Sequence, residues 1–369
     1  MALPLAFMAF RMPYSLSLFV AAMAVALVAT PLVMRLARRA GALDHPGPRR
    51  IHVRPIPTMG GIALVIAVVG VAWVARTLPG PARVLELRPL LGLSLATIPL
   101  LALGMIDDLR GTTPWVKLVI QASSALVLSL FGYGVPLITN PFGGSLATGP
   151  LNVPLTVVWV LVVVNAINLI DGLDGLASGA VFISSMALWW VARTHGDFYV
   201  MFVSSLLAGA TLGFLRYNFP PARVFMGDTG SHFLGLVMAA ASLLESRKGT
   251  ATVTLLFPLV AMGLPIADSV LAFIRRLLRG TPVFRADSEH IHHRLLRLGL
   301  SPRNALFVLW YLCVYTGVMA VVLAAMPREY AWIVAALLAL GLVFAFEVME
   351  FIDRKIAQRP RDSDDDASR

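Results

Sequence analysis

Several short stretches of this sequence place carboxylates, amides and cationic side chains close together. In the first, GMIDDL (residues 104–109), Asp107 and Asp108 end an apolar run. Two adjacent carboxylates at such a place are costly unless they meet a cation or a proton. Lys117 opens the next apolar run and can bring a cation to the same place. A solvated helix end is the alternative for the pair, but the nearby lysine favours a site for phosphate.

A second stretch, NAINLIDGLDGLASG (residues 165–179), combines amides with carboxylates. Asn165, Asn168 and Asp171 are three residues apart, so on a continuing helix they share one face, with Asp174 a further turn on. The glycines between them let the chain turn and let a ligand approach. Asn side chains also join helices in membranes, but two amides and two carboxylates in one row exceed what packing needs. We therefore expect a functional site here.

A third stretch, RVFMGDTGS (residues 223–231), precedes an apolar run and contains Gly227 and Asp228. Its hydroxyls and glycines lie where a helix would begin, and the free N–H groups and dipole of a helix N-terminus favour phosphate. Asp228 can instead cap the helix. Capping alone does not require the rest of the stretch, so the two roles can coexist.

Histidines mark two further stretches. SEHIHHR (residues 288–294) lies in a loop rich in arginine, and DHPGPRRIH (residues 44–52) ends at His52. The first stretch contributes His290, His292, His293 and Arg294. His-x-His-His can bind a transition metal such as zinc, but among arginines it better suits phosphate and sugar hydroxyls. The arginines near His52 can alternatively contact anionic lipid.

The composition identifies the setting of these stretches. Of 369 residues, 58% are hydrophobic and 14% are charged, which is typical of a membrane protein rather than a soluble one. The net charge of +10 does not indicate nucleic-acid binding, because Lys and Arg lie in short loops between apolar runs. A single cysteine, Cys313, excludes a disulfide framework and a cysteine metal site.

Apolar runs of about 20 residues predict an all-α, polytopic membrane protein with about 11 transmembrane helices. The predicted spans are 14–34, 59–78, 88–106, 116–134, 153–170, 175–193, 198–216, 230–246, 251–274, 304–325 and 330–352. Residues 1–352 then form one integral-membrane catalytic domain. Residues 353–369, which lack apolar content, form a cytoplasmic tail that we expect to be disordered.

The distribution of cations predicts the orientation. Alternate loops together with the tail contain about 22 Lys and Arg, against about 8 on the other side, so the N-terminus is expected outside. The carboxylate, amide and histidine stretches then fall on the cytoplasmic face. Such donors suit an anionic substrate that chelates Mg²⁺, with Mn²⁺ as an alternative. A nucleotide diphosphate and a lipid phosphate at the membrane surface both fit.

The ordered stretches resemble the polyprenyl-phosphate N-acetylhexosamine-1-phosphate transferase family. This family includes undecaprenyl-phosphate GlcNAc-1-phosphate transferases and phospho-MurNAc-pentapeptide translocases. The resemblance runs from about residue 44 to 300 through HPGPRRIHVRPIPTMGGIA, GMIDDL, PWVKL, NAINLIDGLDGLASG, RVFMGDTGSHFLG and HIHHRL. It implies an active site on the cytoplasmic face, where a lipid phosphate attacks the phosphorus that bears the sugar of a UDP-sugar and UMP leaves.

The resemblance also implies roles for individual residues. Asp228 and Asn168 match Mg²⁺ ligands. Asp107 and Asp108 match a pair discussed as base or as organisers of lipid phosphate and metal, and Lys117 matches a cation near the phosphates. The other matching positions are expected to bind substrate, with Asp171 and Asp174 at the nucleotide: Asn165, Asp171, Asp174, Gly227, His52, His290, His292, His293 and Arg294.

The interrupted histidine stretch is similar to the GlcNAc branch, because the pentapeptide translocases carry three uninterrupted histidines. UDP-GlcNAc is therefore the expected donor, with another UDP-N-acetylhexosamine as the alternative. A polytopic transporter is the competing class, but transporters bind substrate near the midplane on matched halves. Location in a bacterial inner membrane follows from the resemblance. A homodimer is compatible with the sequence, although no motif specifies one.

Overall fold

The computed structural model describes residues 5–46, 54–78, 85–139, 145–248, 260, 262–278 and 291–327, with isolated positions between 330 and 347. Almost all of the described chain is helical. The long helices are α1 (Leu5–Ala40), α4 (Leu87–Arg110), α5 (Pro114–Leu130), α6 (Asn152–Ile170), α7 (Leu176–His195), α8 (Phe198–Asn218), α9 (Gly227–Lys248), α11 (Gly263–Leu278) and α13 (Pro302–Ala325). The helix over residues 61–77 consists of α2 (Gly61–Val65), a π-helical turn η1 (Ile66–Gly70) and α3 (Val71–Thr77).

Short elements connect these helices. A short helix, α12 (Ile291–Arg297), precedes α13, and a 3-10 turn, η3 (Gly149–Leu151), precedes α6. Two antiparallel hairpins complete the described elements, β1 (Leu43–Asp44) with β2 (Ile56–Pro57), and β3 (Leu137–Thr139) with β4 (Ser145–Ala147). The helices therefore account for the shape of the molecule.

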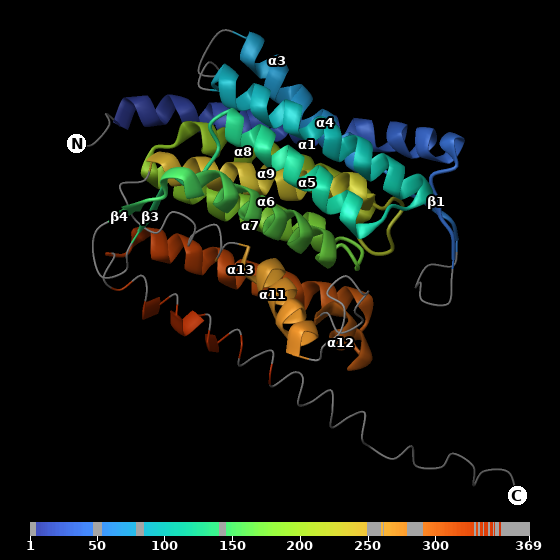
Figure 1. Ribbon diagram of the computed structural model, residues 1–369. Helices are drawn as coiled ribbons and strands as arrows, with labels where there is room; N and C mark the ends of the chain where they lie inside the picture. The colour runs from blue at the N-terminus through green and yellow to red at the C-terminus, as the bar shows by residue number, and fades with distance from the viewer. Residues whose placement is uncertain are drawn as a thin grey trace, which may run out of the picture.

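Six described helices are long and apolar enough to cross a membrane: Pro13–Ala40, Leu87–Arg110, Gly149–Ile170, Leu176–His195, Phe198–Asn218 and Pro302–Ala325. They lie side by side in a bundle with the shorter apolar helices Gly61–Thr77 and Pro114–Leu130 (Figure 1). The protein is thus a multi-pass membrane protein, as the composition predicts. The expected total of 11 spans stays a prediction, since most of 330–352, part of 251–274 and the tail 353–369 lie outside the described residues.

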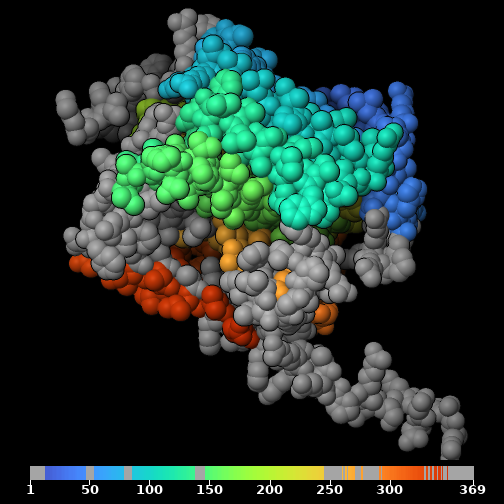
Figure 2. All heavy atoms as spheres, viewed as in Figure 1, coloured from blue at the N-terminus to red at the C-terminus, as the bar shows by residue number. Residues whose placement is uncertain are grey.

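Apolar side chains cover the outside of this bundle as well as its interior. Val28 is 65% exposed and Leu130 is 75% exposed, although both belong to apolar helices. The atoms of α4 and α5 form the upper middle of the face seen in Figure 2. By contrast, 83% of the apolar window of α8 is buried. An apolar exterior around an enclosed central helix is the arrangement expected in a lipid bilayer.

Small residues bring α1 and α8 into contact. A Cβ atom added at Gly209 would lie 2.1 Å from the carbonyl oxygen of Phe19, and one at Gly213 would lie 2.5 Å from that of Met23. Helix pairs in membranes gain stability from such close backbone packing, which glycines four residues apart permit. α1 is therefore fixed against the central helix.

The connection between α1 and α2 is joined to the segment that precedes α9. Gly60 N donates to Phe225 O at 3.0 Å, Gly61 N donates to Met226 O at 3.0 Å, and Phe225 N donates to Pro57 O at 2.9 Å. A Cβ at Gly61 would lie 2.1 Å from Gly230 N, so this approach requires glycine. These contacts set where α9 begins.

Candidate active site

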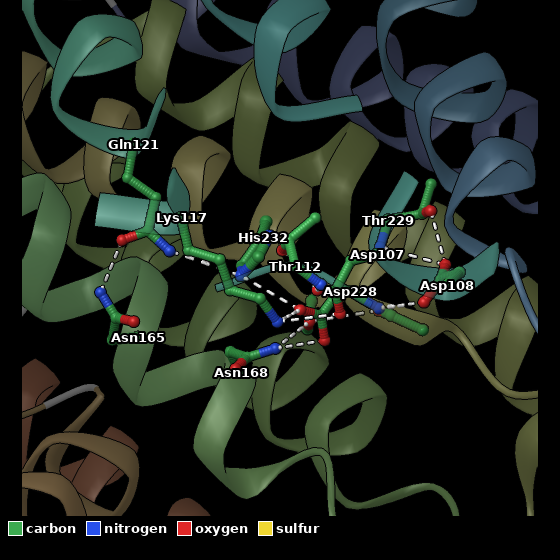
Figure 3. A network of polar contacts seen from close by, with 12 residues as sticks. Asp107, Asp108, Thr112, Lys117, Gln121, Asn165, Asn168, Asp228, Thr229 and His232 are labelled. Atoms are coloured by element: carbon green, nitrogen blue, oxygen red, sulfur yellow. Dashed lines mark hydrogen bonds and ion pairs between the residues drawn. The ribbon is translucent and has the colours of Figure 1, made fainter. Parts of the chain in front are cut away.

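Four helix ends meet at one end of the bundle and bring polar side chains together. Asp107 lies in the last turn of α4, Lys117 in the first turn of α5, Asn168 in the last turn of α6 and Asp228 in the first turn of α9. Figure 3 shows these four residues, here named the Lys117 cluster, converging from the four helices. Polar groups at helix ends, rather than at midplane breaks, fit an enzyme at the membrane surface better than a transporter.

Lys117 is the central cation of this cluster. Its Nζ lies 2.8 Å from Asp107 Oδ2 and 2.5 Å from Asp228 Oδ2. Asp107 Oδ1 also accepts hydrogen bonds from Thr112 N at 2.8 Å and Thr112 Oγ1 at 2.5 Å. The structure thus places Lys117 beside Asp107, as the sequence predicts, and its role toward phosphate stays a prediction. One ammonium group therefore bridges two carboxylates that come from different helices.

Asn168 holds the other side of Asp228. Its Nδ2 donates to Asp228 Oδ1 and to Ser231 Oγ, each at 2.9 Å. Both contacts use the amide nitrogen of Asn168, and neither involves its amide oxygen. The sequence prediction that Asn168 and Asp228 belong to one site is thus matched by direct contact.

Asp108 faces away from Lys117 and toward the start of α9. Asp108 Oδ1 accepts from Asp228 N at 2.9 Å, and Asp108 Oδ2 accepts from Thr229 Oγ1 at 2.6 Å. Successive residues of a helix are about 100° apart, so the adjacent Asp107 and Asp108 contact different partners. Among the hydrogen bonds of the described residues, none joins the Asp228 carboxylate to an N–H of its own helix, and Asp108 supplies the acceptors instead.

Asn165 belongs to a buried polar chain that includes two residues missed in the sequence. Its Nδ2 donates to Leu161 O at 2.8 Å and to Gln121 Oε1 at 2.7 Å, and Gln121 Nε2 lies 3.4 Å from His232 Nε2. Because the Leu161 carbonyl can only accept, Asn165 donates through Nδ2 and Gln121 accepts through Oε1, so Gln121 Nε2 is the atom that faces His232 Nε2.

The sequence signal for Gln121 and His232 is their spacing. Each lies four residues after a member of the Lys117 cluster, Lys117 and Asp228 respectively, and so on the same helix face. Both side chains are fully buried, and His232 Nε2 lies 3.8 Å from Asp228 Oδ2. A polar residue one helical turn further into the bundle than a site residue therefore indicates buried polar contacts behind the site.

The helical row predicted for residues 165–174 ends early. α6 ends at Ile170, so Asp171 and Asp174 lie in the turn that leads to α7 rather than on a continuing helix. Asp174 Oδ2 accepts from Ala222 N at 2.9 Å. Glycine at 175 adopts φ +76°, which permits this turn.

Asp171 places a further carboxyl group near the cluster. Burial raises the pKa of the Asp171 carboxyl well above its ordinary value, and the nearby Asp228, Asp108 and Asp174 carboxylates raise it further. Because each of these groups disfavours ionisation of the others, the site favours a cation.

The histidine stretch is described in part. His52 and His290 lie outside the described residues, and His292 is described as part of α12 without its side chain. His293 is exposed and Arg294 is 3% exposed on the same helix. Asp268 Oδ1 accepts from Ile291 N at 3.2 Å, which joins α11 to the start of α12. The binding roles predicted for these residues stay predictions.

The oxygen donors of the cluster fit Mg²⁺. Asp228 offers a carboxylate and Asn168 an amide oxygen, and Mg²⁺ is usually bound by one or two protein oxygens together with waters and substrate phosphates. Among the described residues, no group of three or more His, Cys, Asp or Glu is placed to hold a metal ion by itself. A metal shared with a phosphorylated substrate fits this donor set, whereas a complete protein cage does not.

Sequence comparisons place this site in a known family. Residues 90–246 match glycosyl transferase family 4, a range that contains the whole Lys117 cluster. A probable undecaprenyl-phosphate N-acetylglucosaminyl 1-phosphate transferase of Bacillus subtilis is 34% identical over 342 residues, covering 91% of this chain and 92% of the relative.

Two further relatives have related names. A decaprenyl-phosphate N-acetylglucosaminephosphotransferase of Mycobacterium tuberculosis is 34% identical over 79% of this chain and 77% of the relative. A phospho-N-acetylmuramoyl-pentapeptide-transferase of Desulforudis audaxviator is 32% identical over 77% of this chain and 89% of the relative. The family match and the identity and coverage of these relatives show that the chain belongs to the glycosyl transferase family 4 of polyprenyl-phosphate sugar-1-phosphate transferases.

Proposed function

We propose that this protein transfers N-acetylglucosamine 1-phosphate from UDP-GlcNAc to undecaprenyl or another polyprenyl phosphate and releases UMP. The product is the first lipid-linked intermediate of a cell-envelope glycan. The observation that carries the proposal is the contact of Lys117 with Asp107 and Asp228, which assembles a phosphate-type site at one end of a membrane bundle. The names of the relatives supply the sugar and the lipid.

The reaction needs positioning and charge neutralisation more than proton removal. An oxygen of the lipid phosphate attacks the phosphorus that bears the sugar, a new P–O bond forms, and the bond to the UMP phosphate breaks. The second pKa of a phosphate is near 6, so the lipid phosphate is largely ionised at neutral pH. Lys117 then stabilises charge on the transferring phosphoryl group, and the N-terminus of α5 attracts phosphate.

The proposal includes a divalent cation. Asp228 and Asn168 would hold Mg²⁺, or Mn²⁺ in its place. When bound, such an ion neutralises the pyrophosphate and orients the donor. Lys117 and Asn168 keep the carboxylate of Asp228 at the meeting point of α5, α6 and α9. Asp107 holds Lys117 from the side of α4.

The remaining sequence predictions form part of the same proposal. The bundle has about 11 spans with the N-terminus outside, the site faces the cytoplasm, and the membrane is the bacterial inner membrane. Asp171 and Asp174 shape the nucleotide pocket, and the histidine stretch contacts phosphate and sugar hydroxyls. A homodimer stays a prediction.

Measuring UMP release from UDP-GlcNAc by the purified protein tests the proposal. We expect release to require both undecaprenyl phosphate and Mg²⁺, to stop with EDTA, and to yield a lipid pyrophosphoryl-GlcNAc detectable by mass spectrometry. UDP-GalNAc and UDP-MurNAc-pentapeptide in parallel reactions compare the other sugar classes. A protein that releases no UMP from any of these donors, with lipid and metal present, would contradict the transferase proposal.

A further inference from the structure

We propose that Asp108 is a positioning residue that fixes the first turn of α9, and thereby Asp228, rather than a proton acceptor or metal ligand. Gly227 is the position that admits the Asp108 carboxylate. The inference rests on the proposed function for its effect on turnover. The contact of Asp108 on α4 with the first turn of α9, here named the Asp108 anchor, can be measured without any activity.

The anchor satisfies groups that a helix start otherwise leaves unpaired. The first N–H groups of a helix have no partner within the helix. Asp108 Oδ1 accepts from Asp228 N at 2.9 Å, and Oδ2 accepts from Thr229 N at 3.4 Å and Thr229 Oγ1 at 2.6 Å. Both carboxylate oxygens are thus committed to α9. A cap usually comes from the residue just before the helix, but here it comes from another helix, so it joins the two.

Glycines create the space for this contact. A Cβ at Gly227 would lie 2.3 Å from Asp108 Oδ2, and Gly227 also has φ +69°. A Cβ at Gly104, one turn before Asp108 on α4, would lie 2.4 Å from Thr229 Cα. The backbones of α4 and α9 therefore meet where Asp108 docks, and a side chain at either glycine displaces the anchor.

Asp107, the residue next to Asp108, contacts different partners. Asp107 contacts Lys117 and Thr112, on the side of α5. Asp108 contacts the backbone of α9 on a different side of α4. The two adjacent residues thus act in different ways: Asp107 balances the cation of the site, and Asp108 sets the place of the helix that carries Asp228.

The Asp108 anchor also determines the position of Asp228, the proposed metal ligand. Asp228 belongs to the turn whose N–H groups Asp108 holds, and its carboxylate meets Asn168 and Lys117. If the turn is released, Asp228 moves relative to both partners. A displacement of about 1 Å in such a site can cost about 100-fold in rate. We expect this loss as a lower kcat and a higher Mg²⁺ requirement, with a smaller effect on the KM for the UDP-sugar.

The chain offers a matched pair of variants for the test. Gly227→Ala and Gly111→Ala both place a Cβ at a glycine of positive φ, +69° and +71°, so both variants carry backbone strain. The Cβ at 227 meets the Asp108 carboxylate, whereas the Cβ at 111 meets nothing within 4 Å. Thr229→Val and Thr229→Ser form a second pair, because serine keeps the hydroxyl that donates to Asp108 and valine removes it.

Two measurements are made on each full-length variant and on Asp108→Asn. Hydrogen–deuterium exchange reports the protection of the amides of residues 227–231, and UMP release gives kcat, KM and the Mg²⁺ requirement. We expect faster exchange and a kcat loss of about tenfold or more for Asp108→Asn, Gly227→Ala and Thr229→Val. Gly111→Ala and Thr229→Ser should stay within about twofold of the wild type.

The outcomes separate this inference from the proposed function. Gly227→Ala that behaves as Gly111→Ala does in both measurements overturns the anchor. Loss of turnover without faster exchange also overturns it, because Gly227 or Asp108 would then contact substrate directly. A wild-type protein without transferase activity would contradict the proposed function, and the exchange measurements would still test the anchor.

Discussion

Lys117 and Asp228 form an ion pair across 111 positions of the sequence, with Lys117 Nζ donating to Asp228 Oδ2. The same ammonium group contacts Asp107, so α4, α5 and α9 meet through one side chain. The predictions below begin with this pair.

Lys117→Met is expected to reduce turnover by about 100-fold or more, because it removes the cation that faces the transferring phosphate and leaves two carboxylates unpaired. Lys117→Arg keeps the charge and should retain more activity, although its planar group fits the two carboxylates differently. UMP release under saturating substrates measures both variants. Equal turnover for Lys117→Met and the wild type would contradict a role for this cation.

Asp228→Ala is expected to be at least as damaging as Asp108→Ala. The first change removes a proposed metal ligand, whereas the second removes a contact to its backbone. Asp228→Asn, which keeps one oxygen, should raise the Mg²⁺ concentration needed for half-maximal rate. The measurement is UMP release across a Mg²⁺ titration. Near-normal turnover of Asp228→Ala at ordinary Mg²⁺ concentrations would be inconsistent with metal-assisted positioning as the main source of catalysis.

Gln121→Leu is expected to destabilise the fold by about 1–3 kcal/mol, because it leaves the half-buried amide of Asn165 and the buried imidazole of His232 without this partner. His232→Leu removes one of those groups. In the Gln121→Leu background His232→Leu should therefore cost less than it does alone. Thermal unfolding of the four proteins in detergent gives this coupling. Strictly additive effects would show that the two side chains do not interact.

Asp171→Asn is expected to stabilise the metal-free protein at neutral pH. The pKa of Asp171 is raised by burial and then by neighbouring carboxylates. The neutral carboxyl is therefore the form that the fold favours, and its contribution is lost as the pH rises through the raised pKa. The stabilisation should disappear in acid, below the ordinary Asp pKa of about 4. Melting temperatures measured against pH with EDTA present, and with Asp174→Asn as comparison, check the sign.

Gly209→Ala is expected to weaken the packing of α1 on α8 by roughly 1–3 kcal/mol, because its Cβ would lie 2.1 Å from Phe19 O. Gly70→Ala is the control, since the nearest atom to its Cβ is Ile66 Cγ2 at 4.0 Å. Thermal unfolding in detergent compares them. A Gly209→Ala protein as stable as Gly70→Ala would show that the α1–α8 contact adjusts freely.

The sequence predicts the members of the site better than their contacts. Asp107, Lys117, Asn168 and Asp228 are each found at the end of an apolar run, where a polar side chain needs a partner. The directions of Asp107 and Asp108 depend on how α4 is rotated against α9, and one sequence does not contain that rotation. Gln121 lies inside an apolar run, where its polar character resembles ordinary helix packing.

The sequence also predicts some helix ends correctly and others incorrectly. The start of α7 at Leu176 lies next to the predicted 175, because the preceding glycines interrupt the apolar pattern. The end of α6 at Ile170 removes Asp171 from the predicted row, since the chain turns where Asp171 N donates to Asn168 O. Local turn geometry overrides the helical spacing there. The first helix extends to Ala40, beyond the predicted span, because its polar last turns continue past the apolar stretch.

The hydrogen bonds between Gly60 and Phe225, and between Gly61 and Met226, have a consequence for biosynthesis. A ribosome delivers residues 60 and 61 to the membrane long before residue 225 has been made. Gly60 and Gly61 therefore lack these hydrogen-bond acceptors while α4 to α8 are inserted. Completion of the site therefore follows the synthesis of α9, after α4, α5 and α6 have been made.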